Sequence, residues 1–176
     1  QRLDISEHTV KFHVNALLAW LGAQLQISPP PRAANDVLLH ANQETLQEAL
    51  LLLYSVSFTQ GTGVHLALDV STLGAWFRVK FDRTKPLPAS LEGMLQSFGE
   101  HWRGQDTAFE LYTARDFVRL NGCDLLLNAK ESTGEFAFFV RASGARAQTG
   151  PLQPAGQVAA APPDQTRMLA PKAGQE

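Results

Sequence analysis

The chain has 176 residues, of which 44% are hydrophobic and 18% are charged, with a formal net charge of −2 and one cysteine. At roughly 100–200 residues per domain, this length suits one ordinary domain plus a fragment. The charge excludes a protein that coats nucleic acid over its whole surface. The single Cys123 excludes a disulfide framework and a cysteine-rich zinc module. No apolar run is long enough to span a membrane, and we expect a cytoplasmic protein.

The first predicted element is a helix over residues 7–21. Its apolar residues recur at three- and four-residue spacing, as in an amphipathic helix: Val10, Val14, Leu17, Leu18 and Leu21. Ser6 stands at the expected N-cap, and Gly22 stands where helices commonly end. Because the first residue is Gln rather than Met, we also expect that the natural protein extends further upstream.

The order of residues in this segment resembles the second half of the helix-turn-helix of LuxR/FixJ-type regulators. Residues 1–18, QRLDISEHTVKFHVNALL, follow its Ile-Ser and Thr-Val-Lys-x-His-Val pattern, and Leu21-Gly22 follows its Leu-Gly ending. The resemblance implies a recognition helix that starts at Ser6 and enters the major groove. The implied DNA-contacting residues are Ser6, Thr9, Lys11, Phe12, His13 and Asn15. Of these, the lysine, the phenylalanine and the asparagine would face bases, and the others would approach phosphates or the neighbouring backbone.

The match to this family is partial. The scaffold helices that should precede the recognition helix are absent, and a proline run replaces the closing helix. A recognition helix without these supports cannot be held at the angle and depth that base readout needs. We therefore expect at most weak, nonspecific DNA binding.

A second interpretation of the same segment is a degenerate phosphoacceptor box of a histidine kinase over residues 8–11. It would make His8 a phosphorylation site. However, Phe12-His13 stands where that family has Thr-Pro, and the second helix of the dimerisation hairpin has no room before Pro29.

Beyond the proline run, the pattern predicts a single α/β domain. Residues 28–35 form a linker between an N-terminal piece (1–27) and a domain (36–142), since consecutive prolines exclude a continuous helix. Alternating or continuous apolar runs predict strands at 37–39, 64–70, 76–81, 124–128 and 135–140, and helical periodicity predicts helices at 46–56, 91–98 and 109–120. This order predicts a two-layer α/β sandwich, with a mixed sheet and its helices on one face.

The last segment, residues 143–176, is dominated by Ala, Gly, Pro and Gln and lacks aromatic residues. Such a composition does not bury enough apolar surface to offset the entropy of ordering. We expect a disordered tail.

Three segments of the middle domain resemble the ATP-binding domain of histidine kinases in the GHKL superfamily. Residues 42–59 resemble the helix of its N-box, residues 79–88 resemble its first glycine box, and residues 117–122 resemble the helix end before its last hairpin. The resemblance implies a histidine-kinase ATPase-like fold.

The residues that would carry nucleotide chemistry depart from that family. The magnesium-coordinating asparagine of the N-box falls on Tyr54, which cannot replace an oxygen ligand for a hard cation. The first glycine box keeps its adenine-binding carboxylate as Asp82, but its glycines fall on Thr84 and Pro86. The second box falls on 106–111, which includes Thr107 and two carboxylates that would repel a triphosphate. The degenerate nucleotide-binding residues are therefore Asp82, Thr84 and Thr107, and we expect no ATP hydrolysis.

Other chemistry-bearing residues favour plain structural roles. His65 and Asp69 share one side of a strand without a nucleophile pattern, which favours a surface pair. Cys123 lacks a Cys-x-x-Cys partner and favours a buried, inert thiol. No metal-ligand cluster and no catalytic motif is present, so we predict no catalytic residue, no metal site and no cofactor.

Together these patterns predict a bacterial two-component-type regulatory protein. In this hypothesis a LuxR-type remnant is joined to a catalytically inactive, pseudokinase-like ATPase domain that binds a protein partner or a second copy. The alternative is a divergent sensor histidine kinase that retains ATP binding through Asp82, has ATP and magnesium as cofactors and uses His8 as a degenerate phosphoacceptor.

Overall fold

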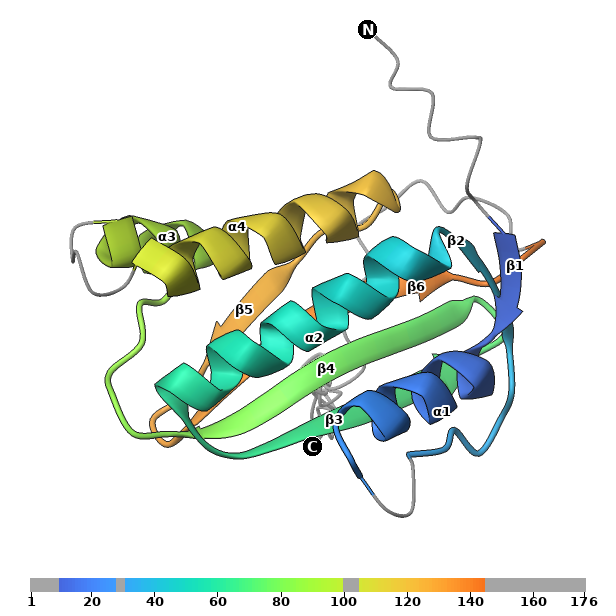
Figure 1. Cartoon of the computed structure of the whole chain (residues 1–176), viewed down its shortest axis with the longest axis horizontal. Coiled ribbons are helices and arrows are strands. Elements are labelled where there is room, and N and C mark those ends of the chain that lie inside the picture. The colour runs from blue at the N-terminus through green and yellow to red at the C-terminus, as the bar shows by residue number, and fades with distance from the viewer. Residues whose placement is uncertain (1–9, 28–30, 100–104, 145–176) are drawn as a thin grey trace, which may run out of the picture.

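Six strands and four helices make up the part of the chain that this computed structural model describes, residues 10–27, 31–99 and 105–144. They follow one another in the order β1-α1-β2-α2-β3-β4-α3-α4-β5-β6. A four-stranded sheet forms one layer, and the helices lie together over one of its faces (Figure 1). The two-layer α/β architecture expected from the sequence is confirmed.

The larger sheet has the strand order β3-β4-β6-β5. Its strands are β3 (Gly61–Ser71), β4 (Gly74–Arg83), β5 (Leu126–Ala129) and β6 (Thr133–Arg141). Every neighbouring pair is antiparallel, where a mixed sheet was expected. Short turns join β3 to β4 and β5 to β6, and a tight turn can connect only antiparallel neighbours.

Side chains alternate between the two faces of each strand. On β4, Phe77, Val79 and Phe81 point toward the helices and are at most 1% exposed. Arg78 and Lys80 lie between them and point to the opposite face, which we call the outer face. The outer face is turned away from the viewer in Figure 1.

Capping and turn residues fix where the helices of the helix layer begin and end. Its helices are α1 (Val14–Gln24), α2 (Gln43–Gln60), α3 (Leu91–Gly99) and α4 (Gln105–Leu120). α2 begins at Asn42, whose side chain accepts a hydrogen bond from the backbone N–H of Thr45 at 3.1 Å. α4 is followed by Gly122 at φ 69°, a left-handed conformation that favours glycine and ends the helix where the sequence predicts.

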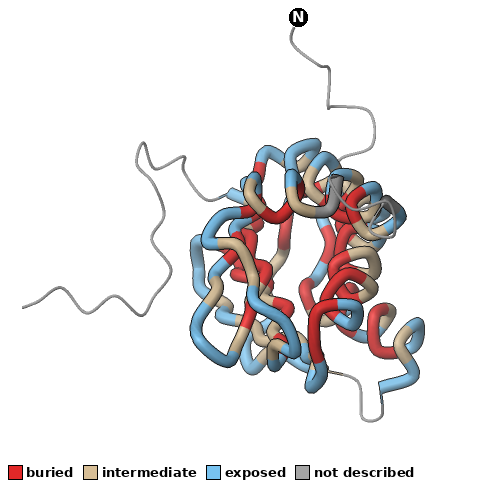
Figure 2. Tube along the Cα trace, turned by 90° about the vertical axis from the view of Figure 1, so that its left-hand side faces the viewer, coloured by how far each residue is buried: buried red, intermediate tan, exposed pale blue. Residues whose placement is uncertain are grey.

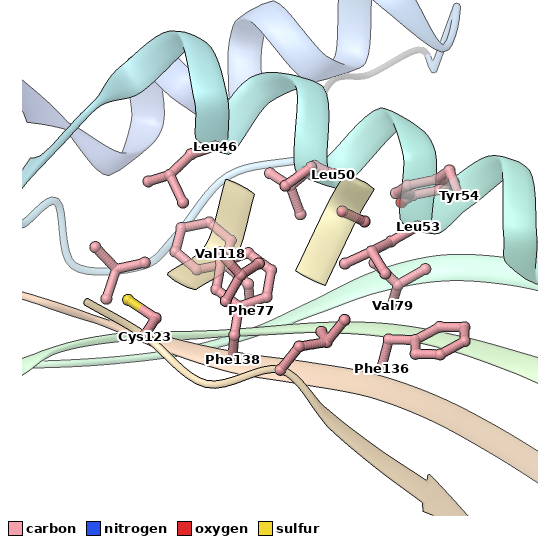
Figure 3. Close-up of a cluster of buried hydrophobic side chains, with 14 of the residues drawn as sticks. Leu46, Leu50, Leu53, Tyr54, Phe77, Val79, Val118, Cys123, Phe136 and Phe138 are labelled. Atoms are coloured by element: carbon pink, nitrogen blue, oxygen red, sulfur yellow. The ribbon is translucent and has the colours of Figure 1, made fainter. Parts of the chain in front are cut away.

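The core lies between the two layers, where the buried segments of the trace face one another (Figure 2). Leu46, Leu50 and Leu53 of α2 point down onto the aromatic rings of the sheet (Figure 3). The Phe77 and Phe138 rings stack there with their centroids 5.3 Å apart. Because a fully buried Leu or Phe stabilises by roughly 1.5–3 kcal/mol, this contact is the main source of stability.

The helix predicted over residues 7–21 is wrong at its start. Val10–His13 forms strand β1, which pairs antiparallel with β2 (Leu38–Ala41), and α1 begins only at Val14. Val10 and Val14 fit helical spacing, whereas Val10 and Phe12 fit the two-residue spacing of a strand, and strand pairing decides between the two periods. Residues 1–9 lie outside the described part of the chain.

The described part of the N-terminal piece packs into the same core as the sheet. Phe12, Val14, Leu17 and Leu21 belong to one cluster with the buried residues of α2 and β4. The two-stranded sheet also meets the larger one, because Leu39 bridges to Ala142 just beyond β6. This segment is therefore part of the folded unit, although the sequence suggested a separate piece.

None of the helices in the described ranges is both long and apolar enough to cross a membrane. Of the tail predicted at 143–176, Ser143 and Gly144 are described, and residues 145–176 lie outside the described part.

Candidate functional site

Tyr54 occupies the α2 position at which the resemblance to histidine kinases implies a magnesium-binding asparagine. Its side chain is only 2% exposed and belongs to the buried hydrophobic cluster drawn in Figure 3. The hydroxyl is buried without a hydrogen-bond partner among the described residues. Burial raises the pKa of the phenol to about 12, and the nearby backbone of Leu66 opposes only part of that rise. The phenol is therefore neutral at physiological pH and cannot offer an oxyanion to a cation.

α2 and α4 are joined directly beside this position. The Ser55 hydroxyl lies 3.0 and 3.1 Å from the two carboxylate oxygens of Glu110, to which it can donate. At the other end of the two helices, the Asn121 side-chain oxygen accepts from the Asn42 backbone N–H at 2.6 Å, and its nitrogen donates to the Thr45 hydroxyl at 2.8 Å. The polar groups between these helices are thus engaged with one another.

Large aromatic side chains are exposed on the same two helices. Phe58 of α2 is 61% exposed, and Phe109 and Tyr112 of α4 are 72% and 42% exposed. The Phe58 ring lies 6.3 Å from that of Tyr54, and the Arg115 guanidinium lies 4.9 Å from the centre of the Tyr112 ring. Exposed aromatic rings of this size often mark a protein-interaction surface.

The three predicted nucleotide-binding residues are not brought together. Asp82 follows Phe81, which is buried beneath the helices, so the Asp82 side chain lies on the outer face. Thr107 lies in the first turn of α4, in the helix layer. Thr84 is tied by its backbone N–H and its hydroxyl, both at 3.1 Å, to the Gln60 carbonyl at the end of α2. Since the sheet separates Asp82 from Thr107, the predicted set does not line one pocket.

Three of the four predicted DNA-contacting residues that the structure describes are buried or make internal contacts. Phe12 is 6% exposed, so the prediction that it faces bases is wrong. His13 Nδ1 lies 3.1 Å from Asp36 Oδ2. The Asn15 side chain accepts from the Ala33 backbone N–H at 2.8 Å. Lys11 is exposed on β1, where the recognition helix was expected.

The remaining predicted site residues of this segment, Ser6, His8 and Thr9, lie outside the described residues. Of the residues singled out elsewhere, Cys123 is buried as predicted. Burial and the nearby Asp124 carboxylate raise the pKa of its thiol to about 12, which makes it a poor nucleophile. His65 and Asp69 do not pair with each other: His65 contacts the Gly63 carbonyl, and Asp69 pairs with Arg78. Within residues 10–27, 31–99 and 105–144, no three His, Cys, Asp or Glu side chains are grouped as metal ligands.

A cavity of about 790 Å³ lies on the outer face, and the sequence patterns did not single it out. Charged side chains line it, among them Arg78, Lys80, Asp82 and Glu135. Alternation along residues 76–82 places three of these charges on one face, so the signal was present in the strand pattern.

Several solved structures of histidine kinases share this arrangement. The catalytic domain of histidine kinase ThkA, in a nucleotide-free form, is similar with a TM-score of 0.58 and 12% identity, covering 76% of this chain and 97% of that domain. Full-length ShkA in complex with AMPPNP is similar with a TM-score of 0.55 and 16% identity over 78% of this chain. The match covers only 32% of the length of ShkA. Histidine kinase AdeS of Acinetobacter baumannii gives 0.51 and 7% identity, covering 76% of this chain and 67% of AdeS.

These comparisons show the fold, which is that of histidine kinase ATPase-like domains. The expected resemblance of the middle domain is confirmed at this level, and the comparisons give no support to the LuxR-type resemblance. No protein-family profile matches the chain, and no curated protein does.

Proposed function

We propose that this chain is a bacterial signalling protein of the two-component type, in which an ATPase-like domain acts as a protein-interaction module and does not transfer phosphoryl groups. The fold supports the signalling context. Tyr54, which stands at the expected N-box position, supports the loss of catalysis.

The observation that carries the proposal is the burial of Tyr54. Magnesium binds hard oxygen ligands and stays strongly hydrated. A neutral phenol at 2% exposure, set against apolar residues, supplies neither an anionic oxygen nor room for hydrated metal. Phosphoryl transfer from ATP depends on such a metal to neutralise charge on the phosphates.

The first turns of α4 support the same conclusion. Helix N-termini bind phosphate well because their free N–H groups and dipole favour negative charge. Here Asp106 is in the first turn, and Glu110 follows one turn later with both oxygens engaged by Ser55. A triphosphate at this end of α4 would meet two carboxylates.

The exposed aromatic residues Phe58, Phe109 and Tyr112 are the surface we assign to a protein partner or a second copy. If they mediate self-association, Phe109→Ser lowers the average mass in sedimentation equilibrium. If they bind another protein, the wild type sediments as a monomer. A dimer whose mass the substitution leaves unchanged contradicts this assignment of the surface.

Calorimetric titration with ATP, with and without magnesium, tests the loss of catalysis. A histidine kinase catalytic domain with an intact N-box serves as the positive control. We expect no magnesium-dependent heat for this chain. Micromolar, magnesium-dependent ATP affinity that is lost in Asp82→Ala would establish the alternative, a divergent kinase.

DNA binding is not part of the proposal, because Phe12 is buried and Asn15 holds the Ala33 backbone. Fluorescence anisotropy should detect only weak binding that falls steeply with salt. Tight, sequence-selective binding lost in Lys11→Ala would contradict this.

A further inference from the structure

The outer face of the sheet carries a row of polar side chains that runs across all four strands. The strand register places His65 opposite Lys80, Lys80 opposite Glu135, and Glu135 opposite Asn128. These four residues, with Arg78 on the next row, line the cavity of about 790 Å³. The helices of the described part of the chain lie on the opposite side of the sheet (Figure 1). The cavity is therefore separate from the α2 and α4 region discussed above.

The carboxylate within the row is already engaged. Glu135 Oε1 accepts a hydrogen bond from the Asn128 side-chain nitrogen at 3.0 Å, and its Oε2 lies 3.7 Å from Lys80 Nζ. The Glu135 side chain is 17% exposed, against 39% for Lys80. The Glu135 carboxylate is thus more buried than the Lys80 ammonium, which keeps N–H groups for another acceptor.

Arg78 adds a buried positive charge beside the row. Its side chain is 13% exposed, and Nη2 lies 2.8 Å from an Asp69 oxygen that belongs to a 56% exposed side chain. Neither Nε nor Nη2 has a well-directed hydrogen bond among the described residues. The exposed Asp69 carboxylate lies on one side of the guanidinium and does not satisfy all of its N–H groups. It therefore offsets the charge of Arg78 only in part.

Cationic side chains outnumber carboxylates in the lining of the cavity, and Asp69, the partner of Arg78, lies outside that lining. Three cationic side chains, Arg78, Lys80 and Lys130, stand against two carboxylates, Asp82 and Glu135. Lys130 makes no ion pair within the described ranges and is exposed at the turn between β5 and β6. A concave site with excess cationic donors attracts small anions.

We propose that this cavity binds a small anion of the carboxylate or phosphate class, with Lys80 and Lys130 as the donors and Arg78 as the fixed charge behind them. The anion accepts hydrogen bonds from those N–H groups that are not engaged by Glu135 and Asp69. The proposed donors lie on β4 and at the β5–β6 turn and need no magnesium, although the cavity shares Asp82 with the nucleotide-binding residues expected from the sequence.

Titration of the full-length, ¹⁵N-labelled chain with inorganic phosphate, and separately with acetate, followed by amide chemical shifts at low ionic strength, tests the proposal. We expect saturable shifts that centre on His65, Lys80, Asn128 and Glu135. Saturation at lower concentration by one of the two probes assigns the ligand class. Shifts that do not saturate, or that centre on α2 and α4, would overturn the proposal.

Lys80→Gln should raise the dissociation constant roughly tenfold, the size expected for losing a charge-assisted hydrogen bond. Lys130→Gln provides a second variant, at an exposed turn where folding is not at risk. Lys11→Gln is the matched control, since Lys11 is an exposed strand lysine away from the cavity. Equal affinity for phosphate in wild type, Lys80→Gln and Lys130→Gln would refute the assignment.

The same variants separate this site from the proposed function. ATP can enter the outer cavity through its phosphates alone, which would give magnesium-independent heat that Lys80→Gln removes. Magnesium-dependent heat that Lys80→Gln leaves unchanged would contradict the inactive-ATPase proposal. The anion site would still be tested by the phosphate titration, whose outcome does not depend on magnesium.

Discussion

The two faces of the four-stranded sheet come from the same strands but carry different chemistry. Toward the helices, Phe77, Phe136 and Phe138 are fully buried and close the space beneath α2. On the outer face, Arg78 and Lys80 alternate along β4 with Phe77, Val79 and Phe81 and border a cavity. The comparison shows that, among the described residues, the side of the sheet beneath α2 is apolar core. The polar groups able to bind a ligand lie on the other side.

The largest effect that tests this comparison is the removal of a ring from each face at neighbouring positions of β6. Phe138 points inward and is 0% exposed, whereas Phe139 points outward and is half-buried against Trp76, with ring centroids 5.4 Å apart. We expect Phe138→Ala to lower the free energy of unfolding by roughly 3–5 kcal/mol and Phe139→Ala by about 1–2 kcal/mol. Urea denaturation measures both, and equal losses would contradict the division of the faces.

Substitutions of Tyr54 test how apolar the space between the sheet and the helices is. Tyr54→Phe removes only an unpartnered hydroxyl, so we expect the free energy of unfolding to stay within about 1 kcal/mol of the wild type or to rise. Tyr54→Asn restores the residue type of an N-box but buries an amide in the core and leaves a void. We expect it to cost about 3 kcal/mol or more.

Calorimetry with ATP on Tyr54→Asn completes this test. If the position still belonged to an open nucleotide site, the asparagine variant would be as stable as Tyr54→Phe and would gain magnesium-dependent affinity. Either result would contradict the view that this position lies in the core.

Much of this fold could be predicted from the sequence, because most elements carry one clear period. The hairpin strands alternate between apolar and polar residues, and α2 repeats its apolar residues at helical spacing until Gly61. β1 could not be predicted in this way, because Val10 fits a helical period with Val14 and a two-residue period with Phe12. Its pairing with β2, which is distant along the chain, decides the conformation.

The candidate sites could be predicted only in part. The position of Tyr54 followed from the N-box resemblance, but its burial depends on packing against β3 and β4. Asp82 was assigned from a motif, although the alternation of Phe81 and Asp82 already placed the carboxylate on the outer face. The bond between Ser55 and Glu110 joins residues far apart in sequence, so no local pattern could show it.

Alkaline pH distinguishes the titratable groups of the inward side from those of the outer face. Burial raises the pKa of Cys123 from 9.0 and that of Tyr54 from 10.0, each to about 12. The unfolded chain therefore loses these protons first, and stability present below pH 9 falls as the pH rises toward 12. Each group contributes at most about 1.4 kcal/mol per pH unit inside its window.

The double variant Tyr54→Phe, Cys123→Ala checks this expectation. Denaturation midpoints measured between pH 8 and 11 should fall less steeply for the variant than for the wild type. An unchanged slope would mean that the two groups are not shielded from solvent between the layers.

The smallest expected effect concerns the polar seam between α2 and α4. Ser55→Ala removes the donor to the Glu110 carboxylate, which is only half-buried and can turn to water, so we expect a loss of about 1 kcal/mol. A double-mutant cycle with Glu110→Ala should give a coupling energy of about 0.5–1 kcal/mol. A coupling near zero would mean that the helices are held by apolar contact alone. α2 and α4 could then separate more easily, and the space beneath them would be more accessible than the burial of Tyr54 indicates.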